Sequence, residues 1–558
     1  MLEASAALVD AFRNPSLRRL QLATIGSILG TFAYFVALGV YAFAHGGTGA
    51  VALVSVLQMI PAGALAPFVA TLADRLPRRL VMVVSDLVRA ALMAAAAGVI
   101  ATGGPAWIVY ALVTATSIAG TAFSPAKAAL LPLLARTPAE LSAANAASTT
   151  IVGAGGFIGP ALGGFLLAAT NAEVVFAVNA LSFLWSAALV LSLRVERQEP
   201  EPAEERHEAS GEAGVRALTA GLRVIARSRD LTLLVALFTA QTLVAGALEV
   251  LVVVTALKLL HGGPTEVGAF DAAIGVGGLL GSFVALALAT RNRLAADFGL
   301  GLALFGAMAA IGVAPHLVTG LIALGVLGIG NSLVDIAALT ILQRTVPNDV
   351  LGRVLGLLDG LLLGSIGVGA LAIPLLVGAF GVRASLIVVG AFPVVLVALT
   401  WPRLRRLDAT ARAPELVELL RGVEILAPLP PVRLERLAAS LVPVRLPAGA
   451  TVIREGEEGD RFYVVGEGEV EIQGRTFGPG SSFGEIALLR DVPRTATVTA
   501  ATDVLLHALE RDDFLAAVTA HEPSTAAADA VIARRLGGLR REAAGAGGAE
   551  LTTEAGAA

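Results

Sequence analysis

Apolar stretches long enough to cross a lipid bilayer recur along roughly the first 400 residues of the chain. A membrane-spanning helix requires roughly 20 such residues. We identify about twelve stretches: 20–44, 49–72, 80–102, 105–133, 142–169, 173–193, 230–258, 265–290, 295–313, 316–343, 352–380 and 383–402. Beyond residue 402 they stop, and short alternating segments separated by glycine follow. The pattern predicts an all-α polytopic membrane domain and then a small β domain.

The loops between these stretches differ in charge on the two sides of the membrane. One set is rich in arginine, and it includes Arg13, Arg18, Arg19, Arg75, Arg78, Arg79, Arg136, Arg291, Arg293, Arg344, Arg353 and Arg403 to Arg406. The opposite loops AHGGTGA, ATGGPA, ATNAE and GVAPH contain no Lys or Arg, with Lys258 and Arg383 as exceptions. Positively charged loops stay cytoplasmic. We therefore expect the N-terminus, central linker and C-terminal domain on the cytoplasmic side of a plasma or bacterial inner membrane.

Composition agrees with this interpretation and excludes several classes of protein. The chain is 56% hydrophobic and 15% charged, with a mean hydropathy of +0.79, whereas soluble domains are about 25% charged. It has no cysteine, which excludes disulfides and thiolate metal sites. No GxxxxGK[ST] phosphate loop or metal-ligand cluster is visible in the sequence. We expect neither an enzyme nor an ATP-driven pump, and no metal or cofactor.

An acidic segment, RVERQEPEPAEERHEASGEAG, separates the sixth and seventh apolar stretches and has no apolar periodicity. It predicts a solvated linker over residues 194–229 between two six-helix halves, residues 1–193 and 230–402. Six plus six spans with a long central loop is the organisation of a transporter built from two similar halves. Such transporters bind substrate near the membrane midplane, between the halves.

Two motifs in the first half carry a family resemblance. LADRLPRR, Leu72 to Arg79, resembles the signature loop of the major facilitator superfamily, with Pro77 at its usual glycine. The resemblance implies a cytoplasmic latch; its residues would be Asp74, Arg75, Arg78 and Arg79, with Asp86 and Arg89 as an adjacent structural pair. Alternatively, the arginines only set the topology.

The second motif is GFIGPALGG in the fifth stretch. With Gly155 before it, it resembles the glycine-proline motif of drug/proton antiporters in the same superfamily, through Gly155, Gly159, Pro160, Gly163 and Gly164. Glycines four residues apart let helices approach closely, so plain small-residue packing is the alternative. Together with SDLVRA and NAASTTIVG, the motifs resemble the efflux-like branch across residues 15–402.

Acidic residues inside the apolar stretches are candidates for proton coupling, because ionisable groups in spans are costly and usually functional. Glu249 is the first candidate, since no Lys or Arg lies within a helical turn of it. Asp271 and Asp335, the latter with Asn331, are further candidates. The alternative for Glu249 is a carboxyl group that contacts trapped water or hydrogen bonds to Gln241 or to a neighbouring helix. Substrate, transport direction and coupling ion stay open.

The C-terminal part changes character. A charged connector over residues 403–423 precedes a helix and many short strands with glycine turns, which favour a small jelly-roll barrel with flanking helices over residues 424–541. Residues 542–558 are expected to be a disordered tail. Within the barrel, FGEIALLRDVPRTATV offers Glu485 as an acceptor for a ribose hydroxyl and Arg494 as a bidentate phosphate ligand.

This pattern resembles the cyclic nucleotide-binding domain family. The resemblance implies that Gly484, Glu485 and Ala487 contact ribose and phosphate, that Arg494 and Thr495 contact the cyclic phosphate, and that Val464 and Val470 or nearby apolar residues surround the base. The binding cassette also includes Phe483, Ile486 and Ala496. The family's lid helix would be AAADAVIARRLGGLRREAA, with Arg534, Arg535 or Arg540 over the base. A degenerate barrel that no longer binds ligand is the alternative.

Three functions compete. The first is a secondary active transporter of a small molecule, regulated by cyclic AMP or cyclic GMP. The second is a non-transporting, membrane-anchored nucleotide sensor. The third, a nucleotide-gated channel, lacks a TVGYG filter and an Arg-repeat voltage helix. No helix-turn-helix follows the barrel, so we expect no nucleic-acid partner. We favour the first. The choice of nucleotide, its sign of action and the oligomeric state stay open.

Overall fold

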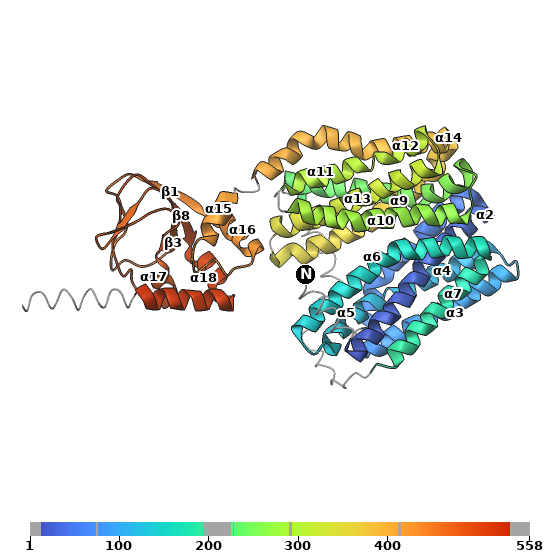
Figure 1. Cartoon of the computed structure of the whole chain (residues 1–558), viewed down its shortest axis with the longest axis horizontal. Helices are drawn as coiled ribbons and strands as arrows, with labels where there is room; N and C mark the ends of the chain where they lie inside the picture. Colours follow the sequence, from blue (N-terminus) through green and yellow to red (C-terminus); the bar gives the residue numbers. More distant parts are fainter. Residues whose placement is uncertain are drawn as a thin grey trace, which may run out of the picture. The chain divides into compact units, whose positions relative to one another are not determined.

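The structure is a computed structural model that describes residues 13–73, 76–193, 225–226, 228–289, 293–346, 348–410 and 414–535. The chain divides into two compact units, Met1–Asp408 and Ala409–Ala558. Figure 1 shows the first as a bundle of long helices and the second as a small β structure with short helices. Each unit is described by itself.

All regular secondary structure in the described residues of the first unit is helical. Its elements are α2 (Pro15–Ala73), α3 (Arg78–Ala101), α4 (Ala106–Gly120), α5 (Phe123–Leu134), α6 (Pro138–Ala169), α7 (Ala172–Leu191), α9 (Arg229–Val254), the π-helix η2 (Thr255–Leu259), α10 (Pro264–Ala289), α11 (Leu294–Leu304), α12 (Ala307–Val313), α13 (Leu317–Thr345) and α14 (Asn348–Thr410).

Ten stretches of the described residues are long and apolar enough to cross a membrane. Two of them contain 52 residues each, Pro15–Ala66 and Val354–Arg405. At 1.5 Å per residue each would measure about 78 Å, more than twice the hydrocarbon thickness of roughly 30 Å. Both are interrupted by glycine in a non-helical conformation, Gly47 at φ +60° and Gly381 at φ +78°. Counting each as two spans gives twelve, which agrees with the sequence pattern. The protein is a multi-pass membrane protein.

The two halves of this unit meet through helices from each side. In the first half α6 packs against α2, and across the boundary α6 packs against α10 and α2 against α9. The contact depends on glycine: a Cβ atom at Gly163 would lie 2.3 Å from the carbonyl oxygen of Ala33 in α2. On another face of α6, a Cβ at Gly268 of α10 would lie 2.4 Å from the Pro160 carbonyl oxygen. The glycine-proline segment therefore joins three helices at close range.

The second unit contains two antiparallel four-stranded sheets with helices at their side. The helices are α15 (Pro414–Arg421), α16 (Pro431–Ser440), α17 (Glu485–Arg490), α18 (Arg511–Thr519) and residues 522–535. The strands are β1 (Val442–Leu446), β2 (Thr451–Ile453), β3 (Arg461–Glu467), β4 (Val470–Ile472), β5 (Arg475–Phe477), β6 (Ser482–Phe483), β7 (Val498–Ala500) and β8 (Val504–Glu510). The sheet orders are β1-β8-β3-β6 and β2-β7-β4-β5. The fold class predicted from the sequence is confirmed.

Strand β3 separates two cores, because side chains alternate between the two faces of a strand. Tyr463 and Val465 belong to the core between the sheets, whereas Phe462 and Val464 pack on the helices. Leu420 of α15 is fully buried in that second core. Helix α15 therefore belongs to the second unit, although the sequence pattern places residues 403–423 in a connector.

Candidate functional site

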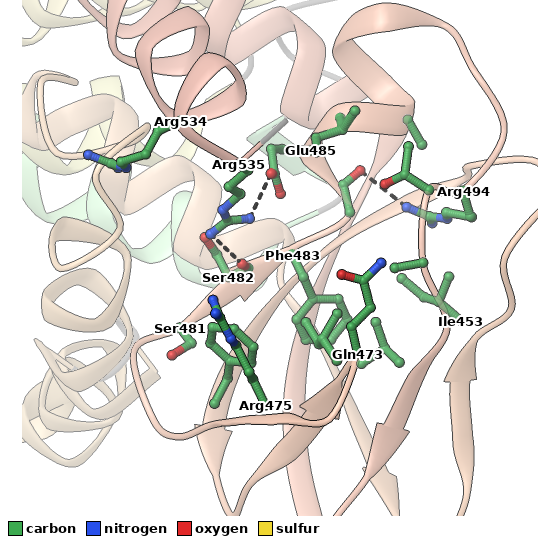
Figure 2. Close-up of a pocket in the computed structure, with 18 residues that line it drawn as sticks. Ile453, Gln473, Arg475, Ser481, Ser482, Phe483, Glu485, Arg494, Arg534 and Arg535 are labelled. Carbon is green, nitrogen blue, oxygen red and sulfur yellow. Dashed lines mark hydrogen bonds and ion pairs between the residues drawn. The ribbon is translucent and has the colours of Figure 1, made fainter. Parts of the chain in front are cut away.

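The second unit contains a cavity of about 330 Å³ between its second sheet and the 482–496 segment, large enough for a small ligand. Figure 2 shows polar and charged side chains reaching it from several elements. Eight residues that the sequence assigns to the nucleotide site all line this cavity: Phe483, Gly484, Glu485, Ile486, Ala487, Arg494, Thr495 and Ala496. Their roles as ligand contacts stay a prediction.

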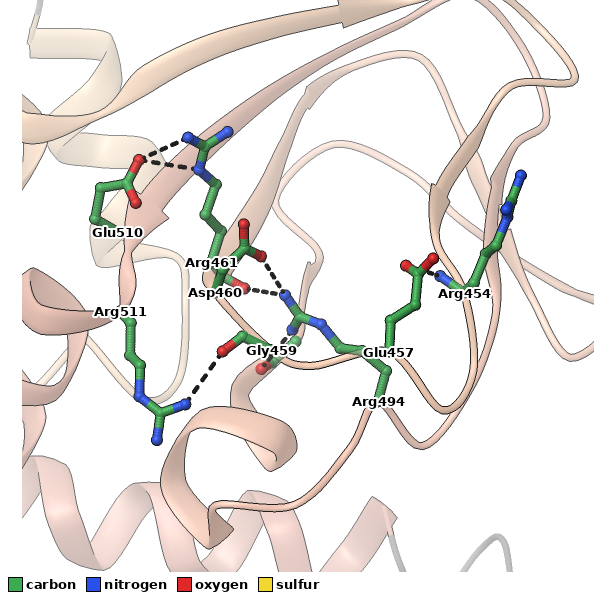
Figure 3. A network of polar contacts seen from close by, with 9 residues as sticks. Arg454, Glu457, Gly459, Asp460, Arg461, Arg494, Glu510 and Arg511 are labelled. Carbon is green, nitrogen blue, oxygen red and sulfur yellow. Dashed lines mark hydrogen bonds and ion pairs between the residues drawn. The ribbon is translucent and has the colours of Figure 1, made fainter.

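Arg494 is held at one end of the cavity by a network of acceptors (Figure 3). Its side chain is 4% exposed and donates to the carbonyl oxygens of Gly484 (3.1 Å) and Arg461 (2.8 Å) and to the Asp460 carboxylate (3.2 Å). A guanidinium group has five N–H donors. These three bonds therefore leave two donors that a ligand oxygen can accept from. The guanidinium is thus oriented before any ligand arrives.

Glycine is required beside this guanidinium. Gly484 adopts φ +93°, a left-handed conformation that side chains other than glycine rarely adopt, and a Cβ there would lie 2.7 Å from Arg494 Nη1. A Cβ at Gly459 would lie 2.8 Å from the Cβ of Ala487. The absence of side chains at both positions lets the segment before α17 close over the arginine.

Glu485 provides the second charge of the cavity. Glu485 is 1% exposed, and its Oε1 atom accepts a 2.6 Å hydrogen bond from Arg535 in the terminal helix, residues 522–535. Arg535 also donates to the Ser482 carbonyl oxygen at 2.9 Å. The other carboxylate oxygen, Oε2, is buried without a partner among the described residues. An acceptor of this kind suits a hydroxyl donor such as a ribose hydroxyl.

Some cavity residues differ from the sequence assignment. Val464 and Val470 are fully buried in packed cores and do not line the cavity. The apolar lining comes instead from Ile453, Ile472, Phe477, Phe483 and Val498. Val464 packs against the helices instead, because of its position in the alternation along β3, and the nearby apolar residues that the resemblance also allowed line the cavity.

Gln473 and Arg475 also line the cavity, and sequence reasoning missed both. Gln473 lies at φ +51° next to Gly474 at φ +74°, in the two-residue turn between β4 and β5. Two successive positive φ values define a type I′ hairpin turn. The QG pair between two short strands was the available signal. Of the lid residues, Arg534 and Arg535 line the cavity, and Arg540 lies outside the described residues.

Two further groups near the site have shifted pKa values. Burial raises the pKa of the Tyr463 hydroxyl, whose ring stacks on Phe483 with centroids 5.3 Å apart. A hydrogen bond to Glu510 raises the pKa of Arg461 further above its usual value. Arg461 therefore stays cationic and paired, and its carbonyl oxygen rather than its side chain contacts Arg494.

In the membrane unit, the structure brings two of the three proton-coupling candidates together. Glu249 of α9 lies within electrostatic range of Asp271 of α10, and Ser55 of α2 lies beside the Glu249 carboxyl group. Gln241, the alternative partner of Glu249, instead donates to Asn331 of α13 at 2.6 Å. Asp335, the third candidate, lies one helical turn after Asn331 on α13 and accepts a 3.0 Å hydrogen bond from it.

The latch motif lies partly outside the described residues, which include neither Asp74 nor Arg75. Arg79 donates to the carbonyl oxygens of Val190 and Leu191 at the end of α7, and so caps that helix. Asp86 and Arg89 form a buried ion pair. The Arg89 guanidinium also lies 4.8 Å and 4.2 Å from the ring centroids of Phe123 and Phe183, which adds cation–π contacts.

Comparison with known proteins identifies both units. The profile of the Major Facilitator Superfamily matches residues 20–359, and that of the cyclic nucleotide-binding domain matches residues 443–521. The chain belongs to the Major Facilitator Superfamily and carries a C-terminal cyclic nucleotide-binding domain.

Two curated relatives and a solved structure match the C-terminal part. The cAMP-dependent protein kinase regulatory subunits of Aspergillus fumigatus and Aspergillus niger are 41% and 39% identical over 102 residues, 17% of this chain and 25% of theirs. The chain thus spans about a quarter of the length of these relatives. A co-crystal structure of the regulatory domain of Toxoplasma gondii PKA with cAMP is 34% identical over 19% of this chain and 43% of its own, with a TM-score of 0.18.

Proposed function

We propose that this protein is a proton-coupled secondary transporter of a small molecule, whose rate is set by cyclic AMP or cyclic GMP bound to its C-terminal domain. The observation that carries the proposal is the joint presence, on a superfamily transporter chain, of Arg494 with two unused donors and Glu485 with an unpaired oxygen in one cavity. These groups match the anionic phosphate and the ribose hydroxyl of a cyclic nucleotide. The arginine-rich loops support a cytoplasmic position for the domain.

Arg535 supports a regulatory role for the nucleotide. In the structure it bonds Oε1 of Glu485, the carboxylate that a ribose would contact through Oε2. A ligand in the cavity therefore shares Glu485 with the terminal helix, and its binding free energy depends on the position of that helix. A ligand shifts a conformational equilibrium only by its difference in affinity for the two states.

Nucleotide binding is tested by calorimetry on the purified full-length protein. We expect binding of cyclic AMP or cyclic GMP, and Arg494→Ala should weaken it by about 2 kcal/mol or more, because a charge-assisted contact to phosphate is lost. Arg461→Ala is the matched control, since the Arg461 side chain pairs with Glu510 outside the cavity. If neither nucleotide binds, or if the Arg494 variant binds with the affinity of wild type, the proposed nucleotide site is rejected.

The proposed proton coupling is tested at Glu249. Glu249→Gln keeps the shape of the side chain but removes the titratable group, so proton-driven transport in proteoliposomes should stop while insertion is unchanged. Asp359→Asn, which removes a carboxylate elsewhere in the same half, is the control. Wild-type rates in the Glu249 variant would move the role to Asp271 or reject proton coupling. The non-transporting sensor is the conclusion if no condition gives transport although nucleotide binds.

A further inference from the structure

Three polar side chains form a directional chain inside the second half of the membrane unit. Gln241 of α9 donates from Nε2 to Asn331 Oδ1 at 2.6 Å, and Asn331 donates from Nδ2 to Asp335 Oδ2 at 3.0 Å. A carboxylate only accepts hydrogen bonds. The Asp335 carboxylate therefore orients the Asn331 amide with its NH2 group towards Asp335. The Asn331 oxygen then faces Gln241, so the Gln241 amide must present its own NH2 group to it. Oε1 of Gln241 is left buried and without a partner among the described residues.

The free groups of this chain are both acceptors. Gln241 is 2% exposed, so its unpaired Oε1 atom cannot rely on bulk water. The second oxygen of Asp335, Oδ1, has no partner within the part of the chain that the structure describes, and the residue is exposed. Of the two, only the exposed Asp335 oxygen is open to a ligand, and a carboxylate oxygen calls for a ligand that donates hydrogen bonds and carries positive charge.

The packing of α13 places Asp335 on the side of that helix that contacts α9 and α10. Asn331 contacts α9, and Ser332 donates to the Gly278 carbonyl oxygen of α10 at 2.7 Å. Asp335 is one helical turn after both residues, so its side chain lies between the faces of α13 that contact α9 and α10. Those two helices are the ones that pack on α2 and α6 of the other half. Figure 1 shows α9, α10 and α13 side by side.

The depth of Asp335 suits a substrate site. It lies ten residues before the end of α13 at Thr345, about 15 Å at 1.5 Å per residue. This is about half of the hydrocarbon thickness, and substrate sites of two-half transporters lie near the midplane.

The surrounding charge is negative. Four helices that pack against α13 among the described residues, α9, α10, α11 and α12, contain a single basic residue, Arg229, the first residue of α9. Their acidic residues are Asp230, Glu249, Glu266, Asp271 and Asp297. Hence no neighbouring cation from these helices competes for Asp335 at its depth.

We propose that Asp335, oriented by Asn331 and Gln241, binds a protonated amine or guanidinium group of the transported substrate. The inference rests on the proposed transport function and adds a substrate class to it: organic cations that carry at least one N–H. It gives Asp335 a role different from proton coupling, which stays with the Glu249–Asp271 pair. Asn331 and Gln241 are positioning residues, since they act on the cation through Asp335.

The test measures equilibrium binding to the full-length protein in nanodiscs by thermal shift. The probes are matched pairs of an amine and its neutral N-acetyl form, beginning with tryptamine and N-acetyltryptamine and extending to phenethylamine and N-acetylphenethylamine. We expect amines to bind about tenfold or more tightly than their neutral partners, and Asp335→Asn to remove that preference. Asp335→Glu should restore part of it, and Asn331→Leu should weaken amine binding while leaving the neutral form unchanged.

Asp359→Asn is the matched control and should bind like wild type. Binding of amines and amides with equal affinity, no binding by any amine, or an unchanged preference in Asp335→Asn would each overturn the inference. Failure here is distinct from failure of nucleotide regulation, because the assay contains no nucleotide and no proton gradient. Arg494→Ala should keep the amine preference of wild type, and Asp335→Asn should keep nucleotide binding.

Discussion

At the scale of single residues, the nucleotide cavity depends on a few charges whose partners are fixed. Glu485 is almost fully buried, and Arg535 is the cation bound to it. Removing one member of such a pair leaves a desolvated charge, which costs more than the pair contributes. Arg534, the neighbouring residue, instead pairs with Glu424, and both side chains are more than half exposed.

The two adjacent arginines therefore make a matched prediction. Arg535→Ala should lower the free energy of unfolding of the C-terminal domain by about 1–3 kcal/mol, because Glu485 loses its charged partner. Arg534→Ala should change it by about 1 kcal/mol or less, because exposed ion pairs contribute little. Chemical denaturation of the two variants measures both values. Equal effects would mean that the Arg535–Glu485 pair does not hold the terminal helix in place.

The residues of the cavity also show which parts of the site can be predicted from the sequence. The segment 483–496 is contiguous, so its glycine, glutamate and arginine spacing could be read directly. Gln473 and Arg535 come from other elements, and only folding brings them to the same cavity. Similarly, the three membrane carboxylates were visible in the sequence, and the contact of Asp335 with Asn331, four residues apart on one helix, could be read directly. Only helix packing decides that Asp271 lies within electrostatic range of Glu249 and that Gln241 bonds to Asn331.

At the scale of elements, the contact between α6 and α2 is limited by backbone approach. Gly163 has no space for a Cβ, whereas nothing lies within 4 Å of a Cβ at Gly153 in the same helix. Alanine favours a helix over glycine by about 1 kcal/mol, and this gain is the same at both positions. Any difference in stability between Gly163→Ala and Gly153→Ala therefore comes from packing alone.

We expect Gly163→Ala to lower the unfolding temperature of the purified protein and Gly153→Ala to leave it unchanged or raise it. The first substitution forces α6 away from α2, and overpacking of this kind typically costs about 1–3 kcal/mol. Thermal unfolding in detergent is the measurement. A Gly163 variant as stable as wild type would show that α6 can move without loss, contrary to a close-packed helix pair.

The elements themselves were largely predictable because membrane spans have a strong length and hydropathy signal. The twelve apolar stretches correspond to helices, including the two hairpins broken at Gly47 and Gly381. Short strands carry less signal. The assignment of α15 to the second unit follows from the burial of Leu420, which the charged sequence around it does not indicate.

At the scale of the whole molecule, the account joins a superfamily transporter and a nucleotide-binding domain in one chain. Coupling between two sites is typically about 1–3 kcal/mol, or roughly 5- to 150-fold in affinity. Because linkage is reciprocal for equilibrium binding, a transported substrate should change nucleotide affinity by the same factor that nucleotide changes substrate affinity.

The most direct test of this account is transport in proteoliposomes with and without saturating nucleotide on the side of the C-terminal domain. A substrate identified by the amine panel is followed together with the pH of the lumen. Wild type should change its rate on addition of nucleotide by a factor within roughly 5- to 150-fold, and Arg494→Ala should show no change at the same concentration. Equal wild-type rates with and without nucleotide, with nucleotide bound, would contradict regulation of transport by the domain.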